Sequence, residues 1–235
     1  MCRSVSDICN DIMQKESPVL FIDTCSLLNI INSLHMNSLS ERYAISALEL
    51  SKMHGNDIWL TTSQNVREEW NDNIDSVIAT MEREVLKIDR NISSMLTVSN
   101  TLLNASYSLP QKISSLNISA HIRSLSKTVL DTCLSLERKD AHTLRAMQRV
   151  RKNEAPARKG KPEPKDCEIV ECFLELGQKL RASGFSKKLI FFTANKDDFG
   201  TNKELKQPLD SQFSAINAEL IDNIDHVLAI AKGQA

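Results

Sequence analysis

The sequence predicts an α/β fold in which a mostly parallel sheet is covered by helices on both faces. Three observations predict it. Short, fully apolar runs recur along the chain and are typical of strands buried on both sides. The segments between them keep the apolar spacing of helices. Gly and Pro are scarce, at six each, and aromatic residues make up only 5% of the chain, which excludes a many-turned β protein.

Four apolar runs are the predicted strands: "PVLFID" (18–23), "DIWLTT" (57–62), "KKLIFFTAN" (187–195) and "SAINAELI" (214–221). Helical spacing and glycine stops at Gly55 and Gly184 predict the helices. These are "TCSLLNIINSLH" after the first strand, 41–55, 63–103, one or two helices in 113–152, 166–184 and a closing "DHVLAIAKG". Strands that alternate with helices in this order predict helices layered on a sheet.

We expect a single domain over residues 1–235, with a helical insertion at about 74–150. Residues 151–165 are rich in Pro, Gly and Lys and predict a loop. Between Arg138 and Lys165 there are ten Lys or Arg residues against three Asp or Glu, although the whole chain has a net charge of −1. This local excess of positive charge indicates a surface that binds a phosphate backbone; an ordinary solvated face is the alternative.

The cysteines and the N-terminus indicate a cytoplasmic protein. None of the six cysteines forms a CxxC pair, and no His pair completes a zinc pattern. The first residues, "MCRSVSDICNDIMQKE", lack the apolar core of a signal peptide. No run approaches the roughly 20 apolar residues that a membrane span needs, so we expect no interaction with a membrane.

Acidic residues follow the predicted strands or begin the helices after them. The carboxyl ends of parallel strands share one edge of a sheet, where α/β proteins place their sites. We expect the carboxylates to meet there and to raise each other's pKa. Oxygen ligands without His or Cys select Mg²⁺ or Mn²⁺, and the chemistry such ions favour is phosphodiester hydrolysis. The residues are Asp23, Glu68 or Glu69, Asp166, and Asp197 or Asp198. The alternative is that each one only caps a helix or faces its N-terminus.

Four segments resemble, in order, the motifs of PIN-domain nucleases: "VLFIDTCSLLNI", "TTSQNVREEW", "KDCEIVECFLEL" and "FFTANKDDFG". The first resembles the family's strand that ends in Asp-Thr. The second resembles its Val-x-x-Glu helix start, the third its Asp-x-x-Ile helix start, and the fourth its Thr-x-(Asp/Asn)-x-x-Asp-Phe turn. The matching residues are Asp23, Glu69, Asp166, Thr193, Asn195, Asp198 and Phe199.

The resemblance implies a three-layer α/β/α sandwich with a central, mainly parallel sheet, and a Mg²⁺- or Mn²⁺-dependent endoribonuclease. It assigns catalysis and metal binding to Asp23, Glu69, Asp166 and Asp198, with Asn195 as a further metal ligand. We expect RNA contacts from Thr193, Arg158, Lys159, Lys161 and Lys165. The basic loop also resembles PIN proteins of bacterial toxin and antiphage-defence systems. The apolar seam of 74–150 either packs on itself or offers an interface to a second copy, as in a homo-oligomer, or to an inhibitory or activating protein.

Two other functions stay open at this point. Asn195 stands where many PIN proteins carry Asp, and Cys25 where Asn or Ser is common. Both departures favour a catalytically inactive PIN module that binds RNA or a partner protein. The third reading is a flap-endonuclease-like DNA nuclease, a structural relative with more acidic ligands and a helical arch, for which the 74–150 insertion is a candidate.

Overall fold

A computed structural model describes residues 2–36, 39–40, 42–201 and 203–234 of the 235-residue chain. Its centre is a five-stranded sheet in the order β3-β2-β1-β4-β7, in which every neighbouring pair is parallel. The strands are β1 (Val19–Ile22), β2 (Trp59–Ser63), β3 (Leu134–Leu136), β4 (Leu189–Phe192) and β7 (Ala218–Ile221). The predicted α/β fold with a central parallel sheet is confirmed.

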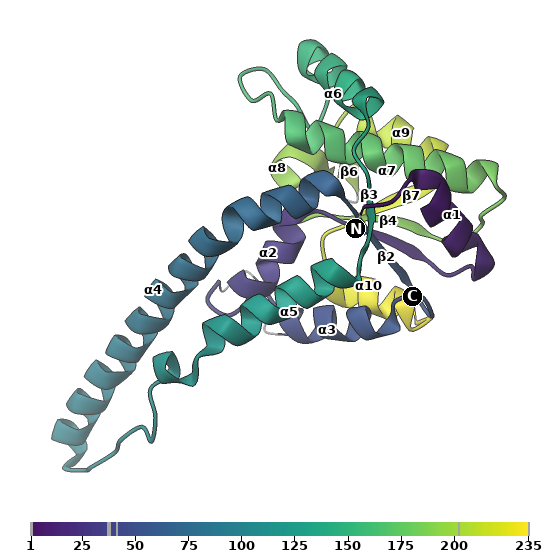
Figure 1. The fold of residues 1–235 in the computed structure, drawn as a ribbon. Coiled ribbons are helices and arrows are strands. Elements are labelled where there is room, and N and C mark those ends of the chain that lie inside the picture. The colour runs from purple at the N-terminus through teal and green to yellow at the C-terminus, as the bar shows by residue number, and fades with distance from the viewer. Residues whose placement is uncertain (1, 37–38, 41, 202, 235) are drawn as a thin grey trace.

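Helices cover both faces of this sheet (Figure 1). One layer holds α1 (Val5–Gln14), α6 (Asp140–Lys152), α7 (Pro164–Ala182) and α9 (Leu209–Ala215). The other holds α2 (Thr24–Asn32), α3 (Tyr43–Met53), α5 (Ile118–Thr132) and α10 (Ile224–Ala231). A short α8 (Lys196–Phe199) and a small hairpin, β5 (Gly200–Thr201) with β6 (Glu204–Leu205), follow β4.

Burial on both faces explains why the strands are apolar throughout. In β1 the ring of Phe21 packs on Phe173 of α7, with 5.5 Å between ring centroids. Its neighbours Leu20 and Ile22 lie on the opposite face, together with Leu27 of α2 and other apolar residues of that layer. Because successive residues of a strand point to opposite faces, a strand in a three-layer sandwich needs apolar residues at every position.

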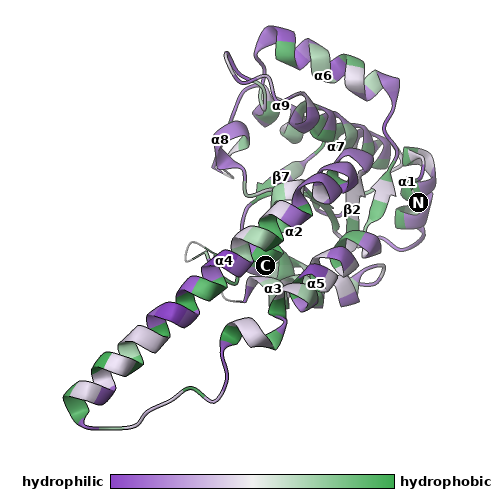
Figure 2. Cartoon of the chain, turned by 60° about the vertical axis from the view of Figure 1, so that its left-hand side comes forward, coloured by the Kyte–Doolittle hydropathy of each residue, from purple (hydrophilic) through white to green (hydrophobic). Residues whose placement is uncertain are grey.

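The longest helix, α4 (Gln64–Leu103), extends far beyond the sheet (Figure 1). Its first half packs on α2 and α5 through residues such as Trp70, but after Asp89 none of its residues is buried in the described chain. Figure 2 shows that hydrophobic residues (green) continue along the free half of this helix, where Met95 and Leu102 are 70% and 78% exposed. Residues 91–111 contain no Asp, Glu, Lys or Arg. The predicted helix over 63–103 is therefore present and forms a protruding arm.

The arm returns through η1 (Ile113–Leu116) to α5 and then to β3, which lies inside the range assigned to the insertion. Residues 74–150 are thus not helical throughout. Three residues are too few to show a strand pattern, and β3 is held at the sheet edge by pairing with β2.

Two further elements differ from the sequence expectations. The polar N-terminus forms α1, whose apolar face of Val5, Ile8 and Ile12 is buried while its charged residues face solvent. The last predicted strand starts at 218 because residues 214 and 215 end α9. Residues 41 and 202, within a predicted helix and a predicted loop, lie outside the described residues. Among the described helices, none has the length and apolar character required to cross a membrane.

Candidate active site

The carboxyl edge of the sheet brings the predicted acids together. Asp23 directly follows β1, Glu69 lies near the start of α4 after β2, and Asp166 lies in the first turn of α7. Asn195 links two of the acids, since its Nδ2 donates to Asp166 at 3.3 Å and to Asp198 at 2.9 Å. The edge that parallel topology predicts for a site is therefore the acidic one.

Asp23 is buried, with 4% exposure, and both of its oxygens accept hydrogen bonds. Oδ1 accepts from the backbone N–H of Thr24 at 2.7 Å and caps α2. Oδ2 accepts from the Thr193 hydroxyl at 2.7 Å and from the Cys25 thiol at 3.1 Å. Burial raises the pKa of Asp23, although these hydrogen bonds oppose the shift. Asp23 thus caps α2 and also lies among the acids at the carboxyl edge of the sheet.

Cys25 takes the place where many PIN proteins carry Asn or Ser. Its Sγ lies between Asp23 and Thr193 and accepts from the backbone N–H of Ala194 at 3.3 Å. Burial raises the pKa of the thiol, so it stays protonated and can donate to Asp23. A thiol therefore contacts Asp23 from the position where a hydroxyl or an amide is common.

Glu69 and Asp166 make no ion pair within the described part of the chain. Glu69 accepts from the Thr24 hydroxyl at 2.6 Å, whereas Glu68 points outward and pairs with Arg138 at 3.2 Å, which supports the choice of Glu69. Burial raises the pKa of Glu69. Burial and the charges of Asp23 and Glu69 raise the pKa of Asp166 to about 8. The predicted mutual repulsion of the carboxylates is present here.

Asp198 behaves differently, although it is only 1% exposed. Its Oδ2 accepts from the Lys161 ammonium and from Asn195. Burial would raise its pKa, but these hydrogen bonds and the charges of Lys161 and Arg158 hold the pKa of Asp198 below its usual value. Its Oδ1 has no hydrogen-bond partner among the described residues, and Arg158 Nη2 lies 3.7 Å from it. Asp197 is exposed and does not take part.

The residues expected to contact RNA differ in their exposure and in their ion-pair partners. Thr193 is 1% exposed and holds Asp23, so its geometry supports a positioning role instead of an RNA contact. Arg158 and Lys161 face Asp198, and Lys165 lies 3.6 Å from Asp72. Lys159 is exposed, and the described residues give it no ion pair.

The donor set fits a divalent cation, but its side chains are not arranged as a finished metal site. No group of three or more His, Cys, Asp or Glu side chains in the described ranges is poised to hold a metal ion. Asp23 accepts protein hydrogen bonds at both oxygens, and Asp198 pairs with Lys161. Asp23, Glu69 and Asp166 are nevertheless hard oxygen ligands, and a cation would relieve their repulsion.

Sequence reasoning missed several polar partners of the acids. Thr24 holds Glu69, and its place beside Asp23 in the Asp-Thr motif was the available signal. Lys161 and Arg158 were assigned to RNA, and nothing in the sequence pairs them with Asp198. Asn65 donates to Glu168 between α4 and α7, and it carries no signal in the sequence.

A five-stranded parallel sheet between helical layers, with carboxylates gathered at its carboxyl edge, defines the class of α/β proteins that place an acidic site beyond their strands. A family model described as PIN domain matches residues 20–199, which is more than half of the chain and includes all four acids. The chain belongs to the PIN-domain family, whose members are generally nucleases. Curated proteins give no match to the chain, and solved structures give none either.

Proposed function

We propose that this PIN domain is a divalent-metal-dependent nuclease that hydrolyses RNA. One observation carries the proposal: Asp23, Glu69 and Asp166 gather without an ion pair to Lys or Arg in the described residues, and burial together with the charges of Asp23 and Glu69 raises the pKa of Asp166 to about 8. Keeping three carboxylates together in this way disfavours the ionised forms unless a cation binds them. Among cations, Mg²⁺ and Mn²⁺ match a ligand set made only of oxygen atoms.

The chain's own residues would perform three tasks. Asp23, Glu69 and Asp166 would hold the ion, which supplies an activated water and neutralises charge on the phosphate. Thr24 and Thr193 keep Glu69 and Asp23 in place through hydrogen bonds of 2.6 and 2.7 Å. Asn195 fixes Asp166 relative to Asp198. Such preorganisation lets a site act without rearranging its polar groups during the reaction.

The arm bears on the choice between RNA and a flap-endonuclease-like DNA substrate. An arch that grips a nucleic acid needs cations along its length, because phosphate contacts supply most of the affinity. Residues 91–111, which form the end of the arm and its return loop, carry no Lys or Arg. This surface favours the RNA nuclease over an enzyme that threads DNA through an arch.

The test is cleavage of labelled single-stranded RNA and of matched DNA with Mn²⁺, Mg²⁺ or EDTA. Wild type is compared with Asp166→Asn, and with Asp197→Asn, which removes the same charge from an exposed neighbour of the site. We expect metal-dependent RNA cleavage by wild type and Asp197→Asn, and none by Asp166→Asn. Equal traces of cleavage in all three proteins would indicate contamination, and cleavage of DNA alone would move the chain to the flap-endonuclease side.

The inactive RNA- or protein-binding module is the second candidate. The observation that favours it is that the hydrogen-bonded Asp23 and the paired Asp198 leave no finished metal cluster in the described residues. Metal titration separates the two functions, because an inactive module gains little thermal stability from Mn²⁺, whereas a ligand of the folded state raises the melting temperature.

A further inference from the structure

A closed turn delivers Lys161 to the acidic site. Arg158 and Lys161 exchange two backbone hydrogen bonds of 2.9 Å each. The turn contains Gly160 with a φ of +81°, a conformation that residues with a Cβ rarely adopt. Beyond it, Lys161 lies against Asp198, and α7 begins at Pro164. The position of Lys161 is therefore set by a defined turn within the loop.

The start of the loop is anchored by a buried arginine. Arg149, at the end of α6, is 2% exposed and donates to Glu171 of α7 at 2.5 Å and to Gln212 of α9 at 2.6 Å. Its third contact, at 2.8 Å, is the backbone carbonyl of Ala155, the point where the chain leaves α6 for the loop. Arg149 thus ties the loop to two helices of the layer.

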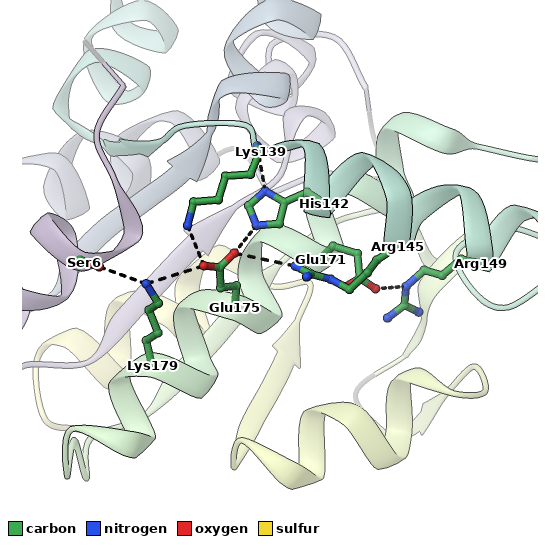
Figure 3. A network of polar contacts seen from close by, with 8 residues as sticks. All are labelled: Ser6, Lys139, His142, Arg145, Arg149, Glu171, Glu175 and Lys179. Atoms are coloured by element: carbon green, nitrogen blue, oxygen red, sulfur yellow. Dashed lines mark hydrogen bonds and ion pairs between the residues drawn. The ribbon is translucent and has the colours of Figure 1, made fainter.

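Figure 3 shows that Arg149 belongs to a longer row of polar contacts between α6 and α7. Glu171 also accepts from Arg145 at 2.7 Å, and Glu175 accepts from Lys139 at 2.7 Å and contacts His142 at 2.5 Å. Because α6 is held along its length, the loop that follows it is presented to the site from a fixed support.

The distribution of charge separates Asp198 from the other three acids. Lys161 contacts Asp198 and lies 3.2 Å from Glu163, while Asp23, Glu69 and Asp166 have no Lys or Arg partner in the described residues. If Asp198 became a metal ligand through its other oxygen, the cation would share a carboxylate that is only 1% exposed with the Lys161 ammonium, and the two positive charges would repel each other. A cation would therefore bind the three unpaired acids and leave the Lys161–Asp198 pair intact.

We propose that Lys161 is an internal cation of this site, which Asp198 holds in place to bind a phosphate of the substrate. The Lys161 side chain is 39% exposed, so the ammonium is reachable from solvent. An ammonium has three N–H donors, and the two carboxylates use at most two of them. The remaining donor is free to bind a phosphate of the substrate. This inference rests on the proposed nuclease function, under which that substrate is RNA. Asp198 is then a positioning residue and not a metal ligand.

The experiment combines two binding assays that need no catalysis. Mn²⁺ binding is measured by titration calorimetry for wild type, Asp198→Asn, Lys161→Met and Asp166→Asn. Binding of single-stranded RNA in EDTA is measured over a range of salt for wild type, Lys161→Met, Lys161→Arg and Lys159→Met. Lys159→Met is the matched control, because it removes the same charge from an exposed neighbour in the same turn. Thermal melts establish that each variant is folded.

We expect Asp166→Asn to lose Mn²⁺ affinity by at least about tenfold, while Asp198→Asn and Lys161→Met stay within about threefold of wild type. Lys161→Met should weaken RNA binding roughly tenfold, the worth of a charged hydrogen bond, and Lys161→Arg should restore most of it. The slope of log affinity against log salt should fall by about 0.7, the value for one lost contact to a single strand.

Two results would overturn the proposal. If Asp198→Asn loses Mn²⁺ as Asp166→Asn does, or Lys161→Met binds Mn²⁺ more tightly than wild type, then Asp198 is a metal ligand that Lys161 blocks. If Lys161→Met and Lys159→Met bind RNA equally, Lys161 makes no special phosphate contact. Failure of the proposed nuclease function would give a different result, in which wild type binds no Mn²⁺ and cleaves no RNA. In that case the RNA-binding assay in EDTA still measures the contribution of Lys161 to RNA affinity.

Discussion

Replacing Asp166 with Asn is expected to stabilise the metal-free protein at neutral pH. The pKa of Asp166 is about 8 in the folded chain, against an ordinary 3.8. Between these values the folded chain keeps a proton that the unfolded chain has released, so the free energy of unfolding falls as pH rises. The fall is about 1.4 kcal/mol per pH unit, or about 4 kcal/mol between pH 4 and pH 7. Asn avoids this cost and can still accept from Asn195.

The assay is urea unfolding of wild type, Asp166→Asn and the control Asp197→Asn in EDTA, at steps from pH 4.5 to 8.5. Wild type and the control should lose stability together as pH rises towards 8, and Asp166→Asn should be about 2–4 kcal/mol more stable at pH 7. The lowered pKa of Asp198 acts outside this window, because its contribution is lost only as the pH falls below about 4.

Mn²⁺ should make wild type more stable than Asp166→Asn. A ligand present at about 1,000 times its dissociation constant stabilises the folded state by about 4.1 kcal/mol, which exceeds the expected advantage of Asp166→Asn, and Asp166→Asn should gain much less than wild type. The reasoning is refuted if Asp166→Asn is the less stable protein in EDTA at pH 7, or if the stability of wild type is flat between pH 5 and pH 8.

Three other changes test separate parts of the structure. Thr193→Val removes the hydroxyl that donates to buried Asp23 and should lower the free energy of unfolding by about 1–3 kcal/mol, whereas an unchanged urea midpoint would contradict the contact. Arg149→Met removes one of the two arginines that donate to buried Glu171 and leaves Arg145 in place, so it should cost about 1.5–3 kcal/mol, compared with less than about 0.5 kcal/mol for exposed Lys152→Met in the same assay. Replacing residues 91–111 by a linker of about four residues should leave the melting temperature unchanged. The reason is that Asp89 accepts from the backbone N–H of Ile113 at 3.0 Å, so the two ends of the replaced segment are already held together. A clear drop in the melting temperature would show that the end of the arm packs on the domain.

Local patterns were enough to predict most of the fold and which acids lie together at the carboxyl edge of the sheet. The apolar strands and the long helix 64–103 follow from periodicity within short windows, and Asp23, Glu69 and Asp166 follow from their positions next to those elements. Strand β3 was missed because three residues carry no periodicity, and its place is fixed by pairing with β2. Prediction was good where the cause of a structure lies in neighbouring residues.

The partner of Asp198 lay beyond such reasoning. Lys161 precedes Asp198 by 37 residues, and their contact depends on a turn and on the buried anchor Arg149. In the sequence Arg149 is one more positive charge of a basic run, and its burial depends on Glu171 facing it from α7. Two acids that look equivalent in the motifs, Asp166 and Asp198, therefore have pKa values shifted in opposite directions.

Ion pairs within the protein also limit what the basic segment from Arg138 to Lys165 can contribute to RNA binding. Most of the ten Lys and Arg residues between Arg138 and Lys165 already have an acidic partner; in the described residues only Arg151 and Lys159 lack one. With Lys161 included, we expect at most about three phosphate contacts, of which the contact from Lys161 is held in place by Asp198 and those from the exposed Arg151 and Lys159 are weaker. Each contact to a single strand contributes about 0.7 to the salt dependence, so log affinity should fall with log salt at a slope of about −2. A slope near −7 would mean that RNA opens these ion pairs and engages the whole segment, and it would refute the view that their acidic partners neutralise most of its charge.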